Sequence, residues 1–163
     1  MNVLGDLERL REGVHPVETS DHPRIMEVWE ASVRATHDFI SEADLQCFKP
    51  LVRGVLPRMS LTCARAASGE VVGFIGTTGA KIDLLFIHPD WRGLGLGRRL
   101  IRHAVSLGAA TVDVNEQNEQ ALGFYLRMGF GIAGRSERDG LGKPYPILHL
   151  RLEHPEAAER PLT

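Results

Sequence analysis

The chain has 163 residues, a length that suits one domain with its own hydrophobic core. Hydrophobic residues make up 43% of the chain and charged residues 25%, and the formal net charge of -2 excludes a general electrostatic affinity for nucleic acid. No apolar run approaches the roughly 18 residues of a membrane span, and the charged residues at positions 1–13 lack the apolar core of a signal peptide. We therefore expect a cytoplasmic protein that binds neither membranes nor nucleic acids.

Hydrophobic periodicity, helix caps and turn residues predict the elements of the fold. In chain order we expect strand 14–18, helices 25–36 and 41–56, strands 59–67, 71–77 and 82–87, helix 96–105, strand 110–114, helix 118–128, and strands 130–135 and 145–152. Pro50 is expected to break or kink the second helix. This order predicts an α/β (α+β) fold, in which helices flank a mixed, mostly antiparallel sheet on both faces.

The domain limits follow from the same pattern. We expect a single domain over residues 14–152, an N-terminal extension over 1–13, and a flexible tail over 153–163, because the tail is polar and contains two prolines. Cys47 and Cys63 have no metal-ligand spacing and are expected to be buried thiols, which suits a reducing compartment. No cluster of histidines or carboxylates has the spacing of a metal site.

The most informative stretch joins the apolar strand 82–87 to the next helix. Pro89 ends the strand, and Gly93, Gly95 and Gly97 then alternate up to the helix start. A helix N-terminus carries unpaired N–H groups and a positive dipole end, and glycine lets a bulky anion approach them. The stretch therefore indicates a diphosphate cradle, although the glycines could instead only shape a tight connection.

Phosphate-binding motifs can be compared with this stretch letter by letter. The P-loop needs a Lys followed by Ser or Thr, which is absent here. The dinucleotide-binding fingerprint needs a different glycine spacing. An acidic residue at about the right distance, Asp113, some 20 residues after Gly93, gives this fingerprint weak support. The three consecutive strands before the cradle argue against a dinucleotide-binding fold. The pattern R-x-x-G-x-G, formed by Arg92, Gly95 and Gly97, is present.

That pattern resembles the acetyl-CoA-binding motif of the GNAT superfamily of N-acetyltransferases. A second stretch, from Asn118 through Tyr125 to Phe130, resembles the other GNAT signature, and the resemblance covers residues 14–152. Residues 35–39 and 114–146 contain runs similar to a small bacterial branch of the family that acts on peptidyl lysine. The resemblance implies the GNAT acyltransferase fold and acetyl-CoA as co-substrate, with no metal.

The resemblance also implies where acetyl-CoA binds. The pantetheine arm would lie between two parallel strands that part, one ending at 85–87 and the other at 112–114, and Asn118 would reach the arm. The diphosphate would bind the amides of the glycine-rich turn. The expected cofactor-binding residues are Leu85, Phe86, Ile87, Arg92, Gly93, Leu94, Gly95, Leu96, Gly97, Arg98, Asn118 and Tyr125.

The chemistry needs a proton donor for the leaving thiolate and a base for the amine. Tyr125 lies two helical turns after Asn118, so both face the same way. Spacing alone favours a core aromatic with a satisfied hydroxyl, whereas the resemblance makes Tyr125 the general acid. Asp83 matches the strand position where many relatives carry a catalytic glutamate, although a lone acid in a strand is more often only solvated or paired. His37 is the alternative base, although a histidine at a helix end can also interact only with the helix dipole.

The acceptor pocket is expected around the first helix, because that region varies with substrate in the family. The candidates are Trp29, Ser32, Thr36, His37 and Phe39, with Tyr145 at the border; an amphipathic core helix is the alternative. The sequence therefore predicts direct transfer of acetyl to a primary amine, either a lysine side chain or a small amine. A non-catalytic acyl-CoA sensor remains the rival function, and the oligomeric state is left open between monomer and homodimer.

Overall fold

The computed structural model describes residues 9–159, whose strands form one sheet in the order β1-β2-β3-β4-β5-β7-β6. Neighbouring strands are antiparallel except β4 and β5, which are parallel. The strands are β1 (His15–Pro16), β2 (Ser60–Arg65), β3 (Val71–Thr78), β4 (Lys81–Ile87), β5 (Thr111–Asn115), β6 (Phe130–Ser136) and β7 (Ile147–Leu152). The predicted mixed, mostly antiparallel sheet is confirmed, and the doubly wound parallel alternative is excluded.

Four α-helices of this part of the chain flank the sheet, as predicted: α2 (His22–Thr36), α3 (Glu42–Val55), α4 (Leu96–Ser106) and α5 (Glu119–Arg127). Ser41 caps α3, because its hydroxyl accepts the N–H of Asp44 at 3.1 Å. Pro50 lies inside α3 without ending it, so of the expected break or kink the break does not occur. No helix in residues 9–159 combines the length and the apolar character that crossing a bilayer requires.

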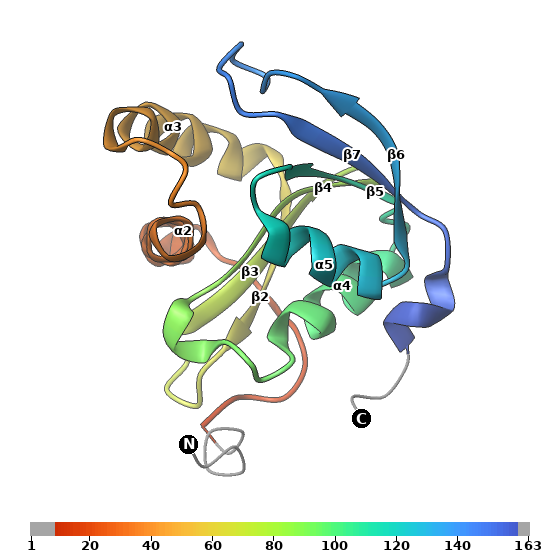
Figure 1. Ribbon diagram of the computed structural model, residues 1–163. Helices are drawn as coiled ribbons and strands as arrows, with labels where there is room; N and C mark the ends of the chain where they lie inside the picture. The colour runs from red at the N-terminus through yellow and green to blue at the C-terminus, as the bar shows by residue number, and fades with distance from the viewer. Residues whose placement is uncertain (1–8, 160–163) are drawn as a thin grey trace.

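The helices form two layers, one on each face of the sheet (Figure 1). Phe74 of β3 and Phe86 of β4 pack with the core under α2 and α3, whereas their neighbours Ile75 and Leu85 pack with the core under α4 and α5. This alternation follows from the two-residue period of a strand. Strands β3 and β4 are therefore covered on both faces.

The two ends of the described chain are held in place. Before β1, the Arg11 N–H donates to the Arg65 carbonyl at 2.9 Å and extends the edge of β2. After β7, residues 155–159 form a short 3₁₀ helix in which Ala157 and Ala158 are buried. The expected flexible tail is thus packed up to residue 159, while residues 1–8 and 160–163 lie outside the described part. Cys63 is buried as expected, but Cys47 is exposed.

Candidate functional site

The site begins where the parallel strands β4 and β5 separate. They pair only at Lys81–Thr111 and Ile82–Val112, although both strands continue further. On its other side, β4 stays paired with β3 as far as Ile87. Asp83 forms a bulge in this pairing, because Ile82 pairs with Thr77 and Leu84 pairs with the next residue, Gly76. The backbone of β4 beyond the bulge therefore faces a gap instead of a neighbouring strand. This gap is the parting of the strands that the sequence predicted, and an extended ligand could pair with it.

The glycine-rich turn lies at the end of β4. Gly93 and Gly95 have φ of 77° and 78°, a left-handed conformation that side chains disfavour. Gly95 is the N-cap of α4, and the buried Leu96 anchors the first turn. Because the first N–H groups of a helix have no partner inside it, the amides of Leu96 and its neighbours present a positive end to the gap.

Gly97 is required for helix packing, unlike Gly93 and Gly95, which adopt a left-handed conformation. An ideal Cβ at this position would lie only 3.2 Å from the Phe124 ring, so the glycine lets α4 approach α5 closely. Its predicted place in the cradle motif therefore coincides with a packing requirement. The spacing alone did not reveal this, because Phe124 is distant in sequence.

Asn118 connects α5 to the far side of the gap. Its side-chain oxygen accepts the Ala121 N–H at 3.1 Å and so caps α5, while its Nδ2 lies 3.3 Å from Nε2 of His37. The residue is only 8% exposed. A contact between positions 37 and 118 therefore joins the end of α2 to the start of α5.

Hydrogen bonds determine the proton position on His37. The Thr36 hydroxyl donates its one hydrogen to the Ser32 carbonyl at 2.7 Å, so it accepts from Nδ1 of His37 at 2.8 Å. Nε2 is then free to accept from Asn118. Burial and, to a smaller extent, the positive charge of Arg92 lower the pKa of His37 from 6.5 to about 4, against the opposing effect of Asp38. The imidazole is neutral at pH 7.

Tyr125 lies beneath the parting strands, in the core that contains Ile82 of β4 and Val112 of β5. The residue is 6% exposed, and within residues 9–159 its hydroxyl has no hydrogen-bond partner. Burial raises the pKa of Tyr125, so the phenol keeps its proton at neutral pH. Asp83 also has a side-chain oxygen without a partner: its Oδ2 is buried and has no hydrogen bond among the described residues.

Aromatic rings run from the gap along the α2 side. The His37 ring lies 6.4 Å from Phe86 of β4 and 5.3 Å from Phe39, and Phe39 lies 6.1 Å from Tyr145. Trp29 and Ser32, also predicted to line the acceptor pocket, are buried in or beside the core under α2. Their positions agree with the core-helix alternative, whereas His37 and Phe39 border the gap.

A polar cluster that the sequence did not predict lies at the end of this series of rings, next to Tyr145. The Asp44 carboxylate of α3 binds the Lys143 ammonium at 2.7 Å and accepts a hydrogen bond from the Tyr145 hydroxyl. The hydrogen bond from Lys143 is the main cause that holds the pKa of Asp44 below its usual range. These contacts join α3 to the β6–β7 connection. Because the residues are about 100 positions apart, only the fold brings them together.

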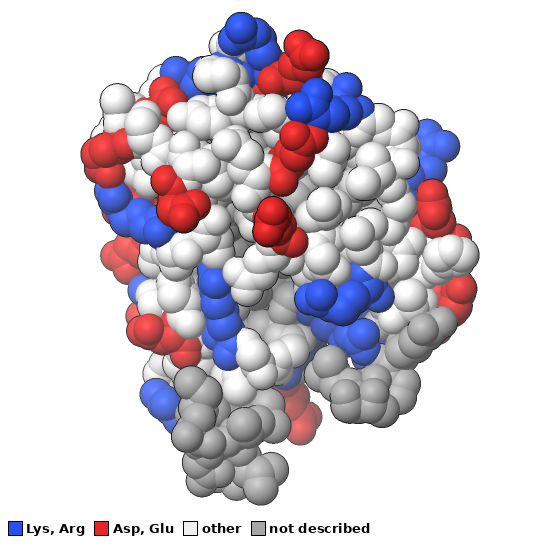
Figure 2. All heavy atoms as spheres, in the orientation of Figure 1, with Lys and Arg blue, Asp and Glu red and all other residues white. Residues whose placement is uncertain are grey.

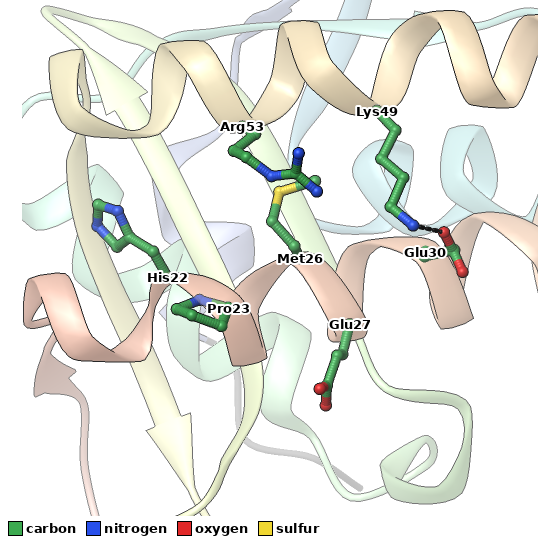
Figure 3. A pocket seen from close by; sticks show the side chains of 7 residues that line it. All are labelled: His22, Pro23, Met26, Glu27, Glu30, Lys49 and Arg53. Atoms are coloured by element: carbon green, nitrogen blue, oxygen red, sulfur yellow. Dashed lines mark ion pairs between the residues drawn. The ribbon is translucent and has the colours of Figure 1, made fainter.

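The surface around the site is basic in part. On the face that carries α4 and α5, Figure 2 shows Lys and Arg side chains on both sides of a hollow in the lower half. A second hollow, of about 330 Å³, lies between α2 and α3 (Figure 3). Met26 lines it between the helices, and the Lys49–Glu30 ion pair of 2.6 Å closes one end. No sequence motif indicated this second hollow.

Comparisons with known proteins agree on one family. Residues 60–132 match the model of the acetyltransferase (GNAT) domain. The chain is 49% identical over 128 residues to the peptidyl-lysine N-acetyltransferase YjaB of Salmonella typhimurium, covering 78% of this chain and 88% of that protein.

Solved structures give the same result. The solution structure of apo-form YjaB from Escherichia coli is 44% identical, with a TM-score of 0.80, and the match covers 86% of this chain and 96% of that chain. The PaiA N-acetyltransferase of Thermoplasma acidophilum, solved in complex with coenzyme A, is 19% identical and has a TM-score of 0.63, with coverage of 83% and 96%. At that identity the second likeness concerns the fold alone.

Proposed function

The chain belongs to the GNAT family of N-acetyltransferases, and we propose that it transfers the acetyl group of acetyl-CoA to a lysine side chain of a protein or peptide. Membership of the family makes the chain an acetyltransferase that uses acetyl-CoA and an amine acceptor. The lysine acceptor is the proposal, supported by the names of relatives that are about half identical over most of their length. A cytoplasmic location and a single catalytic domain are part of the same proposal.

The observation that carries the proposal is the gap between β4 and β5 beside a glycine-rich helix start. The pantetheine arm would pair with the free backbone of Leu85, Phe86 and Ile87. The diphosphate would bind the amides between Arg92 and Arg98, where the dipole of α4 favours an anion. Asn118 would turn its amide from His37 to the arm. The open backbone at Gly93, where a Cβ would meet no atom within 4 Å, is compatible with close approach of a ligand.

Tyr125 is the proposed general acid. Attack by the amine breaks the carbon–sulfur bond of acetyl-CoA, and the departing thiolate needs a proton. A phenol with a raised pKa is protonated at neutral pH, and its hydroxyl has no competing partner among residues 9–159. No covalent enzyme intermediate is needed, because the amine attacks the thioester directly.

Asp83 is the proposed general base, acting directly or through water. Its buried oxygen lacks a partner within the described residues and lies at the bulge where the strands part. His37 is a weaker candidate, because an imidazole with a pKa of about 4 is a poor proton acceptor at pH 7. We assign His37 and Phe39 to the acceptor side, where aromatic faces suit the stem and the charge of a lysine.

The test is release of the CoA thiol from acetyl-CoA with a divided amine panel. One half contains lysine peptides, and the other contains polyamines and small amines. We expect turnover with lysine peptides, reduced about 100-fold in kcat by Tyr125→Phe, with acetyl-CoA affinity nearly unchanged. Tyr145→Phe is the matched control, since it removes the other tyrosine hydroxyl and should keep kcat within about threefold.

Three outcomes would contradict the proposal. Turnover confined to the small amines would overturn the lysine acceptor and keep the family activity. Equal kcat in Tyr125→Phe and wild type would overturn the acid assignment. Silence with every amine, with acetyl-CoA still raising the melting temperature, would favour the sensor function.

A further inference from the structure

A second group of reactive side chains lies outside the gap, on three neighbouring strands. Asp113 of β5 pairs in register with His149 of β7, and Ser136 lies near the end of β6. Nδ1 of His149 is 2.7 Å from Oδ1 of Asp113, and Nε2 is 2.7 Å from the Ser136 hydroxyl oxygen. A serine, a histidine and a carboxylate are thus connected in one line.

This group is on the open face of the sheet. Val112 and Val114, on either side of Asp113, are buried in the core under α4 and α5, as are Leu148 and Leu150 on either side of His149. Because successive strand residues point to opposite faces, Asp113 and His149 point away from that core. Their side chains are 35% and 42% exposed, so small reagents can reach them.

The contacts determine where the protons are. A carboxylate can only accept, so Nδ1 of His149 carries the hydrogen donated to Asp113, and when the ring is neutral Nε2 keeps its lone pair. The Ser136 hydroxyl then donates to Nε2. Lys81 holds the other carboxylate oxygen at 2.9 Å. Burial alone would raise the pKa of Asp113, but hydrogen bonds from Lys81 and His149 hold it below its usual value, and the carboxylate stays ionised.

We propose that Ser136 is a nucleophile activated by His149 and Asp113, and that it takes acyl groups from activated esters and thioesters at a site separate from the amine acetylation site. The Ser136 oxygen attacks the acyl carbonyl carbon while Nε2 of His149 takes the hydroxyl proton. The bond from the acyl carbon to the leaving oxygen or sulfur then breaks, and the leaving group departs with that proton. Ser136 is left as an ester, which water can hydrolyse by the same steps.

The arrangement distinguishes Ser136 from the other serines of residues 9–159. Ser106 donates to the carbonyl of His103 at 2.6 Å, and the Ser41 and Ser68 hydroxyl oxygens accept backbone N–H groups. None of those contacts supplies a base. Because Ser136 gains a base and its orienting carboxylate on an open surface, we expect slow acylation of one serine and not rapid turnover.

The experiment uses the full chain with a fluorophosphonate probe, and separately with p-nitrophenyl acetate, followed by peptide mapping by mass spectrometry. We expect one equivalent of label on Ser136. His149→Gln and Asp113→Asn, with unchanged melting temperatures, should slow labelling about 100-fold and 10-fold. Ser106→Ala is the control and should label at the wild-type rate. If His149→Gln does not fold, His149→Ala with added imidazole should restore labelling.

The proposal is overturned if the wild-type chain is not labelled, if the label falls on other serines, or if His149→Gln reacts at the wild-type rate. Ser136→Ala should retain amine acetylation, and Gly95→Glu, designed to block acetyl-CoA binding, should retain labelling. The two readouts therefore separate a failure of this site from a failure of the proposed acetyltransferase site.

Discussion

Two histidines in different parts of the fold, one at the end of α2 and one on β7, have similar contacts and different chemistry. His37 lies between a hydroxyl and an amide in the buried gap, and His149 lies between a carboxylate and a hydroxyl on an open face. In both cases the neighbours put the proton on Nδ1. Only His149 has an anionic partner that stabilises an imidazolium, whereas burial and Arg92 oppose protonation of His37. The comparison indicates that the partner, and not the imidazole, decides which histidine can act as a base.

Substituting Gly95 should have the largest effect and should separate the two regions. Gly95→Glu puts a side chain at φ 78° and a negative charge at the proposed diphosphate seat. We expect acetyl-CoA affinity to fall at least 100-fold, measured by calorimetry. Gly108→Glu is the matched control, because Gly108 also has a positive φ, at the other end of α4. Comparable losses in both variants would mean that strain, and not the site, explains the effect.

Asp83→Asn tests the assignment of the base in the gap. We expect kcat to fall about 10- to 100-fold, because the amide cannot take the amine proton, while acetyl-CoA affinity changes little. His37→Gln should affect the KM of the amine more than kcat. A pair of kinetic titrations at saturating acetyl-CoA measures both. If kcat were lost only in His37→Gln, then His37 would be the base, which would contradict the conclusion that His37, unlike His149, cannot act as one.

The low pKa of His37 predicts a stability change with pH. The unfolded chain binds the proton near pH 6.5 and the folded chain near 4, so the stabilisation is complete above 6.5 and is lost as the pH falls through 4. The loss should reach about 3 kcal/mol at most. Urea unfolding at several pH values should show this slope in the wild type and a much flatter one in His37→Gln. Equal slopes would contradict the buried neutral imidazole.

Substitutions of Asn118 should have the smallest effect, on stability, and two variants distinguish its two contacts. Asn118→Ala removes the cap of α5 and the bond to His37, and should cost about 1 kcal/mol. Asn118→Ser keeps a capping oxygen but cannot reach His37, so it should cost about half as much. Thermal unfolding of the two variants measures the difference. Equal losses would mean that the bond to His37 alone, and not the cap, explains the role of Asn118 in stability.

The sequence predicted the order of elements, because local periodicity and caps such as Ser41 act over a few residues. It also predicted the parting of β4 and β5, through a family resemblance carried by Arg92 and Asn118. It did not predict the cluster of Asp44 with Lys143, or the line from Asp113 to Ser136. Those contacts depend on strand order and register, which join positions far apart in the chain.

At two further positions, the packing of helices decides what the sequence pattern left open. Gly97 was expected to serve the cradle, and its contact with Phe124 is set by how α4 meets α5. For Trp29 the sequence left open the acceptor pocket and the helix core; the side chain is 4% exposed and packs in the core under α2. A helical period identifies the face of a helix but not which residues on that face reach a cleft.

Amide hydrogen exchange with and without acetyl-CoA is the most direct test of the gap between β4 and β5. We predict that binding protects the amides of residues 85–87 and 92–98 by at least tenfold. Protection should be absent in Gly95→Glu and present in Gly108→Glu. Protection confined to α2 and α3, around the hollow lined by Met26 and Lys49, would contradict the proposed site.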